Sequence, residues 1–140
     1  YGLKPEANKN DDFLAVRLVE QAQSFGLRRS PQIVPVSTYL TNGDIVKIGD
    51  GQLKVLTVPG HSPGSIALYD EKDAFVITGD ALFCGSIGRT DLPGGDYDIL
   101  LQSIREKLFT LPNDTVVLPG HGPASTIGDE KRLNPYFRGV

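Results

Sequence analysis

The sequence contains few of the residues that bind metals or crosslink a fold. Its 140 residues include two histidines and one cysteine, and neither methionine nor tryptophan. The single cysteine, Cys84, excludes an internal disulfide and a cysteine-based zinc knuckle. Because low cysteine usage fits a reducing compartment, we expect a cytoplasmic location.

Long apolar runs and a strong charge imbalance are also missing. No apolar run approaches the roughly 18–20 residues of a membrane-spanning helix, and the net charge is only −3. We therefore expect neither a membrane nor a nucleic acid as a partner. A composition with 39% hydrophobic and 22% charged residues is typical of one globular domain, so we expect residues 1–140 to form a single unit.

Glycine and proline are frequent, at 16 and 10 residues, and predict many turns between short elements. Hydrophobic spacing then separates helices of period 3.6 from strands of period 2. The predicted elements are a helix over 13–25 after an acidic start, a basic loop at 27–32, a strand within 33–39, hairpin strands 44–48 and 53–58, hairpin strands 65–69 and 74–78, a long loop over 79–96, a helix over 97–109, a strand 115–118 and a short helix over 125–133.

Both histidines occur in the same short sequence frame. Residues 58–65 read VPGHSPGS and residues 118–125 read LPGHGPAS, each at the end of a predicted strand. A histidine in a loop is usually structural, but two in one frame indicate a repeated device. Pro-Gly turns the backbone sharply and projects the imidazole of His61 or His121 from the rim of the sheet.

A carboxylate follows a third predicted strand. Residues 75–80 read FVITGD and end in Asp80. If the three strands lie side by side, His61, Asp80 and His121 converge at one edge. Two imidazoles and a carboxylate suit Zn²⁺, Fe²⁺ or Mn²⁺, so the sequence predicts a metal site there.

These motifs together resemble the metallo-β-lactamase superfamily, and most closely its glyoxalase II-like hydrolase branch. The resemblance rests on residues 57–64, 78–80 and 118–123, on GSIGRTD at 85–91 and on GDEKRLNP at 128–135. It covers about residues 11–138 in order. It implies an α/β fold that is part of an αβ/βα sandwich, with a mixed, mostly antiparallel sheet and flanking helices.

The resemblance also implies roles for individual residues. His61 resembles a ligand of a first metal, Asp80 the carboxylate that bridges two metals, and His121 a ligand of the second. Two Zn²⁺ ions are expected per complete site, acting on a small-molecule thioester such as an acylglutathione. Arg89 lies where glyoxalases place a basic residue near glutathione, although a structural pair with Asp91 is an equal alternative.

The family's upstream H-x-H-x-D-H motif is absent, because no histidine precedes His61. The chain therefore resembles the C-terminal half of the domain, with a lead-in and helix over 1–30 and the metal motifs within 33–138. We interpret Tyr1 as the boundary of a longer sequence. We expect the isolated chain to be inactive, and we expect an exposed apolar surface to bind the missing N-terminal half or to self-associate.

Three other functions remain open. The same motifs resemble persulfide dioxygenase, in which one non-haem iron would use His61 and Asp80 and leave His121 spare. Residues 60–64 also spell G-x-S-x-G, and Ser62, Asp80 and His121 follow the order of an α/β-hydrolase triad, but that motif requires a helix after the serine. Finally, the chain could be a non-catalytic or partner-dependent domain.

Overall fold

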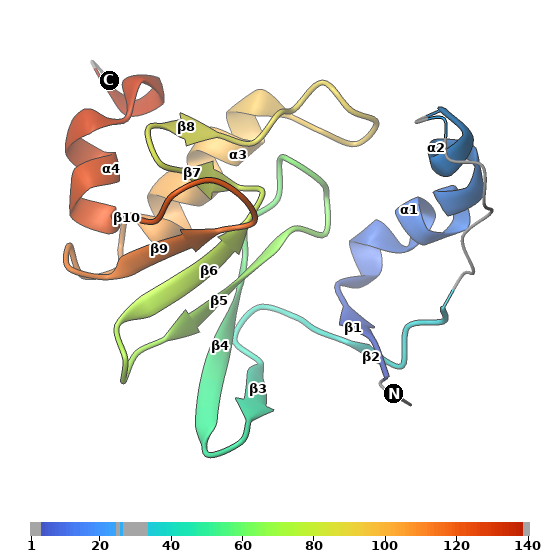
Figure 1. Cartoon of the computed structure of the whole chain (residues 1–140), viewed down its shortest axis with the longest axis horizontal. Helices are drawn as coiled ribbons and strands as arrows, with labels where there is room; N and C mark the ends of the chain where they lie inside the picture. The colour runs from blue at the N-terminus through green and yellow to red at the C-terminus, as the bar shows by residue number, and fades with distance from the viewer. Residues whose placement is uncertain (1–3, 25, 27–33, 139–140) are drawn as a thin grey trace. The chain divides into compact units, whose positions relative to one another are not determined.

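The computed structural model describes residues 4–24, 26 and 34–138 of the chain (Figure 1). The chain divides into two compact units, Tyr1–Leu40 and Thr41–Val140, and each is described by itself. The single incomplete domain over residues 1–140 stays a prediction. None of the helices in the described ranges combines the length and the apolar character that a membrane crossing requires.

The first unit consists of short elements. They are β1 (Glu6–Ala7), η1 (Lys9–Asp11), α1 (Asp12–Val16), α2 (Leu18–Ser24) and β2 (Thr38–Tyr39), and β1 pairs in parallel with β2. The predicted helix over 13–25 is thus two helices interrupted at Arg17. The predicted basic loop at 27–32 lies outside the described residues. The Tyr39 hydroxyl donates to Asp12 (2.6 Å), and this hydrogen bond raises the pKa of Tyr39.

The second unit is built on a six-stranded sheet in the order β10-β9-β6-β5-β4-β3 (Figure 1). Its strands are β3 (Ile45–Ile48), β4 (Gly51–Thr57), β5 (Ile66–Asp70), β6 (Phe75–Gly79), β9 (Val116–Pro119) and β10 (Ser125–Thr126). The β6–β9 pair is parallel, whereas the other pairs of this sheet are antiparallel. This confirms the predicted mixed, mostly antiparallel sheet with flanking helices.

The two predicted hairpins are confirmed as β3–β4 and β5–β6, but the loop over 79–96 was predicted wrongly in part. It contains a small antiparallel hairpin of β7 (Leu82–Phe83) and β8 (Ser86–Ile87). Strands of two residues show no alternation that a sequence pattern can detect. For the same reason the predicted helix over 125–133 begins only at α4 (Ile127–Leu133), after β10.

Helices cover one face of the sheet. The predicted helix over 97–109 is confirmed as α3 (Tyr97–Ser103), which continues into a π-helical turn η2 (Ile104–Leu108). Leu100, Ile104 and Leu108 recur every four residues, so they share one face of the helix. They are fully buried in a core that also holds strand and α4 side chains, namely Val58, Ala67, Val76, Val117 and Ile127. The chain ends in η3 (Pro135–Phe137).

The opposite face of the sheet carries apolar side chains that remain accessible to water. Ile77 and Leu118 are cross-strand neighbours on β6 and β9, and Val116 lies on the same side as Leu118. These three residues are 37%, 37% and 38% exposed. Exposed apolar side chains that lie together on a sheet are suited to burial against another polypeptide segment. Self-association, or packing of a further N-terminal segment there, stays a prediction.

The turn after β4 lies directly against α3. A Cβ added to Gly60 would lie 2.4 Å from the backbone and Cβ of Leu100, and Gly60 has a φ of +131°. Asp96 caps α3 by accepting from the Ile99 N–H (2.9 Å), and its own N–H donates to the Gly60 carbonyl (2.7 Å). Glycine therefore allows the start of the helix to approach the end of the strand that precedes His61.

We expect Gly60→Ala to lower the free energy of unfolding by about 3 kcal/mol, because overpacking and backbone strain each cost about 1–3 kcal/mol. Urea denaturation followed by circular dichroism measures the loss. Gly51→Ala is the matched control, since its Cβ would meet its nearest neighbour at an ordinary 3.4 Å. Equal stability of the two variants would contradict the close approach of Gly60 to α3.

Candidate metal centre

His61, Asp80 and His121 lie at one edge of the sheet. His61 follows β4, Asp80 follows β6 and His121 follows β9. The three strands are not all immediate neighbours, because β5 lies between β4 and β6. The side chains still meet, since β4, β6 and β9 run in the same direction and end at the same edge.

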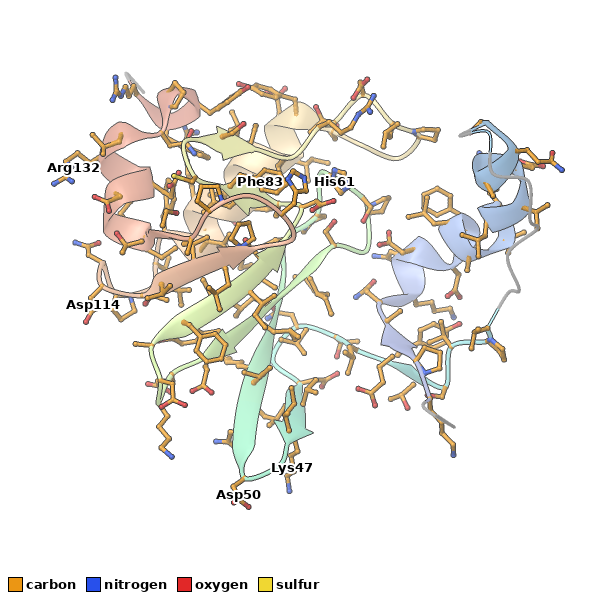
Figure 2. The ribbon with its side chains drawn as sticks, viewed as in Figure 1. Lys47, Asp50, His61, Phe83, Asp114 and Arg132 are labelled. Carbon is orange, nitrogen blue, oxygen red and sulfur yellow. The ribbon has the colours of Figure 1, made fainter. Side chains whose placement is uncertain are left out.

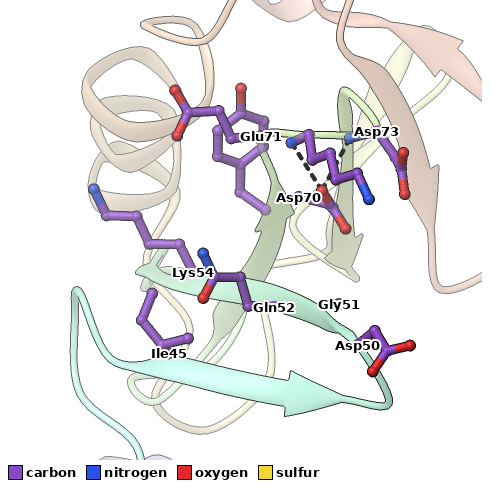
Figure 3. A pocket seen from close by; sticks show the side chains of 10 residues that line it. Ile45, Asp50, Gly51, Gln52, Lys54, Asp70, Glu71 and Asp73 are labelled. Carbon is purple, nitrogen blue, oxygen red and sulfur yellow. Dashed lines mark hydrogen bonds between the residues drawn. The ribbon is translucent and has the colours of Figure 1, made fainter.

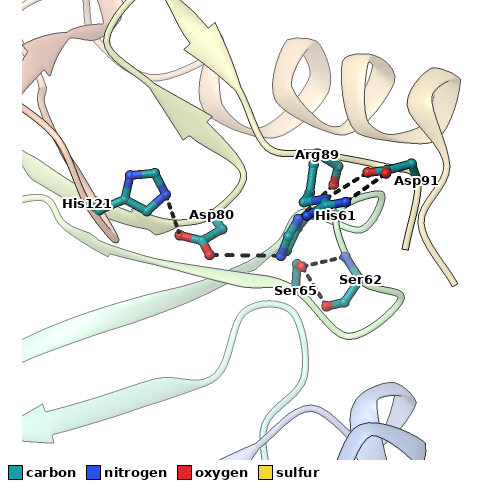
Figure 4. Close-up of polar contacts among 7 residues, drawn as sticks. All are labelled: His61, Ser62, Ser65, Asp80, Arg89, Asp91 and His121. Atoms are coloured by element: carbon teal, nitrogen blue, oxygen red, sulfur yellow. Dashed lines mark hydrogen bonds and ion pairs between the residues drawn. The ribbon is translucent and has the colours of Figure 1, made fainter. Parts of the chain in front are cut away.

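Each imidazole faces a different oxygen of the same carboxylate (Figure 4). His61 Nε2 lies 3.9 Å from Asp80 Oδ2, and His121 Nε2 lies 3.9 Å from Asp80 Oδ1. The three donors therefore form two pairs that share Asp80. No group of three or more His, Cys, Asp or Glu side chains in the described part of the chain is arranged to hold one metal ion.

The separation within each pair is close to that of two ligands on one cation. Zinc binds imidazole nitrogen and carboxylate oxygen at about 2.0–2.2 Å in tetrahedral geometry, which places two donors of one ion about 3.4 Å apart. Both nitrogen–oxygen distances are 3.9 Å, so a movement of about 0.5 Å would bring each pair to that separation. Each pair would supply two ligands to its own ion, and the remaining ligands would have to come from elsewhere.

The backbone fixes the orientation and tautomer of His61. Its Nδ1 lies 2.8 Å from the carbonyl oxygen of Arg89. Because a carbonyl can only accept, Nδ1 carries the proton of this hydrogen bond, and Nε2 is the ring nitrogen on the side of Asp80 that is left for a metal. A hydrogen bond from the other ring nitrogen to a carbonyl is the usual arrangement behind a metal-binding histidine.

A hollow of about 450 Å³ opens over these side chains. Its lining comprises His61, Asp80, Phe83, Cys84, Ser86, Ile87, Gly88, Arg89, His121, Gly122 and Pro123. The β7–β8 hairpin and the residues just after it thus form much of its wall. Figure 2 shows Phe83 and His61 at the same end of the sheet, far from Asp50.

A second hollow, of about 500 Å³, lies at the opposite end of the sheet, by the turns of the β3–β4 and β5–β6 hairpins (Figure 3). It is lined partly by acidic residues, but its buried carboxylate is already engaged. Asp70 accepts from the backbone N–H groups of Lys72 and Asp73 at 2.9 and 3.0 Å. This carboxylate closes the turn between β5 and β6, which is a structural role.

The Arg89 side chain turns to Asp91 and forms two parallel hydrogen bonds of 2.8 and 2.7 Å (Figure 4). The alternative structural pair is therefore present. The backbone and the side chain of Arg89 have separate partners, since its carbonyl orients His61. Contact between Arg89 and a substrate stays a prediction.

The pairing with Arg89 predicts that the Asp91 carboxyl titrates at an unusually low pH. The hydrogen bonds from Arg89 hold the pKa of Asp91 at about 2, below its ordinary 3.8. A depressed carboxyl pKa stabilises the folded chain above pH 3.8, and this small surface contribution is lost as the pH falls toward 2. Carboxyl NMR should record this value, and Arg89→Gln should return it toward 3.8. Titration of Asp91 near 3.8 in the unaltered chain would contradict the pair.

The serine-hydrolase alternative lacks its defining element. Ser62 Oγ lies 2.8 Å from Ser65 Oγ, and the chain continues into strand β5 rather than into a helix. A nucleophile elbow needs a strand–turn–helix at the serine. The G-x-S-x-G pattern here is part of the turn between β4 and β5.

Comparison with known proteins decides the family. A family model described as the metallo-beta-lactamase superfamily matches residues 4–121. The chain belongs to this superfamily. It is 44% identical over 131 residues to hydroxyacylglutathione hydrolase GloC of Haemophilus influenzae. The matched residues make up 94% of this chain and 62% of that protein.

Solved structures with the metallo-β-lactamase fold also resemble this chain. The BLEG-1 B3 metallo-β-lactamase superimposes with a TM-score of 0.87 at 38% identity, covering 99% of this chain and 67% of that one. TTHA1623 in a di-iron-bound form gives a TM-score of 0.83 at 41% identity, covering 96% and 65%. The chain thus spans less than two thirds of the GloC and TTHA1623 chains.

Two features of this metallo-β-lactamase-type edge were not predicted from the sequence. Phe83 stacks on His121, with ring centroids 4.3 Å apart. Gly120 brings its backbone so close that an added Cβ would lie 2.4 Å from Asp80 Oδ1. The repeated P-G-H frame pointed to Gly120, although only as a turn residue, whereas nothing in the sequence indicated the partner of Phe83.

Proposed function

We propose that this chain supplies one part of the metal site of a hydrolase that cleaves a thioester, such as an acylglutathione. The observation that carries the proposal is the carboxylate of Asp80 between two imidazoles, each 3.9 Å from a different oxygen. The similarity to a hydroxyacylglutathione hydrolase supports the substrate class.

In this proposal Asp80 would bridge two divalent cations, with His61 on one and His121 on the other. Such a pair of ions, when bound, lowers the pKa of water and polarises a substrate carbonyl. The chain's own residues hold the ligands in place. The Arg89 carbonyl keeps the proton on His61 Nδ1, and the backbone at Gly120 limits where the Asp80 carboxylate can lie.

The hollow over the site supports a small-molecule substrate. Its wall combines the polar edge of the imidazoles with the apolar side chains of Phe83 and Ile87. The His121 side chain is 74% exposed, so this side of the site is open to an approaching ligand. A thioester fits this chemistry because a thiolate leaves without strong protonation.

The competing function is the persulfide dioxygenase, with a single iron on His61 and Asp80. It leaves His121 without a role, although the two histidines are equally distant from Asp80. Equal spacing favours the two-metal arrangement. The di-iron-bound relative leaves the identity of the metals open between zinc and iron.

The test uses a hybrid of this chain and the part of the Haemophilus influenzae relative that it does not span. Zinc-loaded hybrid should release thiol from an acylglutathione, and Asp80→Asn should abolish the release. An iron-loaded hybrid that consumes O₂ with glutathione persulfide, and leaves thioesters intact, would replace the proposal with the dioxygenase.

The isolated 140-residue chain is expected to have no measurable thioesterase activity, because each metal would have only two protein ligands from these three residues. The same thiol-release assay, run with added Zn²⁺, checks this. Metal-dependent turnover by the chain alone would contradict the incomplete ligand set.

A further inference from the structure

The two imidazoles of the candidate site are held in different ways. The His61 side chain is 23% exposed, and a backbone carbonyl fixes its Nδ1. The His121 side chain is 74% exposed, and in the described part of the chain no hydrogen bond reaches its ring. An exposed imidazole without such a bond needs another contact to keep one orientation.

Phe83 provides that contact. Its ring stacks on the His121 ring with centroids 4.3 Å apart and an interplanar angle of 28°. An offset stack of this kind restricts rotation of the imidazole about its Cα–Cβ and Cβ–Cγ bonds while leaving the ring nitrogens free. Nε2 of His121 remains directed at Asp80 Oδ1, at 3.9 Å.

Phe83 belongs to a hairpin that is held in position by other parts of the fold. It ends β7, next to the fully buried Leu82, and pairs with Ser86 across the small hairpin. The hairpin turn is bound to α4, because the buried Glu130 carboxylate accepts from the Gly85 N–H at 3.1 Å. The position of Phe83 is therefore set by the fold rather than by its contact with His121.

Asn134 adds further hydrogen bonds between the β7–β8 hairpin and the end of α4. It is fully buried, and its side-chain amide donates to the Ser86 carbonyl (3.1 Å) and to Glu130 (2.7 Å). Buried and fully satisfied polar networks of this kind hold a segment in one arrangement. The hairpin that carries Phe83 is thus anchored at its turn, while Phe83 faces the metal-binding edge.

We propose that Phe83 is a positioning residue for His121, and that its ring orients this imidazole for metal binding as the Arg89 carbonyl orients His61. The proposal rests on the proposed function of His121 as a ligand. It predicts that loss of the Phe83 ring weakens metal binding at His121 selectively.

Histidine NMR tests this directly, because the chain has only two imidazoles. In the metal-free chain labelled at histidine, the ring current of Phe83 should displace the ring-proton signals of His121. Phe83→Leu should return them to the positions of an unstacked histidine, and His61 should not change. The conservative Phe83→Tyr should keep the displacement.

The same samples are then titrated with Zn²⁺ alone. In Phe83→Leu, the zinc concentration for half of the His121 response should rise roughly tenfold, at the lower end of the effect of orienting partners. The response of His61 should stay unchanged, and Phe83→Tyr should restore that of His121. Phe109→Leu is the matched control, since its ring packs against Phe137 instead.

The outcomes separate the two proposals. If neither imidazole responds to zinc, in this chain or in the hybrid that supplies the remaining ligands, the proposed function is overturned. If both respond, and Phe83→Leu leaves the signals and zinc response of His121 unchanged, only the role of Phe83 is overturned. Equal weakening at His61 and His121 would also overturn it, because that pattern indicates a general loss of structure.

Discussion

Asp80→Asn is expected to weaken zinc binding at both imidazoles together, by more than about 100-fold, which exceeds the 10–100-fold effect of residues that merely orient ligands. The substitution preserves the size of the side chain but replaces a charged bridge by a neutral amide with one acceptor oxygen. Since His61 and His121 face opposite oxygens of Asp80, both lose their shared partner.

Calorimetric zinc titration of the hybrid, which supplies the remaining ligands, measures this loss, and histidine NMR assigns it to each ring. Asp50→Asn is the control, because it removes the same charge from the exposed turn at the far end of the sheet (Figure 2). If one imidazole keeps its zinc response in Asp80→Asn, that histidine does not share a site with Asp80.

Gly120→Ala should give the second largest effect, a loss of zinc affinity of roughly 10–100-fold with almost unchanged stability. The added Cβ would lie 2.4 Å from Asp80 Oδ1, so the carboxylate has to move. The movement costs little folding energy, since the Asp80 side chain is 44% exposed and can turn into solvent. Metal binding, however, depends on where that oxygen lies.

Paired measurements of zinc affinity and of urea denaturation distinguish this result from ordinary destabilisation. Gly51→Ala again serves as the comparison, because it adds the same methyl group without a close contact. A large fall in stability for Gly120→Ala would show that the glycine is needed for the fold. Unchanged zinc affinity would show that the position of Asp80 Oδ1 is not critical.

The candidate site was predictable from the sequence because strand ends and turn residues leave a strong local signal. The shared P-G-H frame placed His61 and His121 after strands, and an apolar run placed Asp80 after a third. Pairing of strands leaves no such signal. β5 lies between β4 and β6 because consecutive strands pair with one another, β4 with β5 and β5 with β6, each time antiparallel.

The contacts that orient the ligands were beyond sequence analysis for a different reason. Phe83 and Gly85 belong to a hairpin too short to show a period, and their partners His121 and Glu130 lie far away in sequence. Only the tertiary fold brings such residues together. The parallel pairing of β6 with β9 is the step that does so.

That pairing has a consequence for the order of folding. β3, β4, β5 and β6 follow one another with connections of at most eight residues and form local contacts, whereas β9 can pair with β6 only after the crossover that contains α3 has closed. Closing a long loop is slow, so non-local parallel pairing is a late event. His121 therefore joins Asp80 only once this pairing has formed, and a cation bound between them would stabilise the native chain and not the unfolded one. Its main kinetic effect would be to slow unfolding, so that the metal prolongs the life of the native chain without hastening its formation.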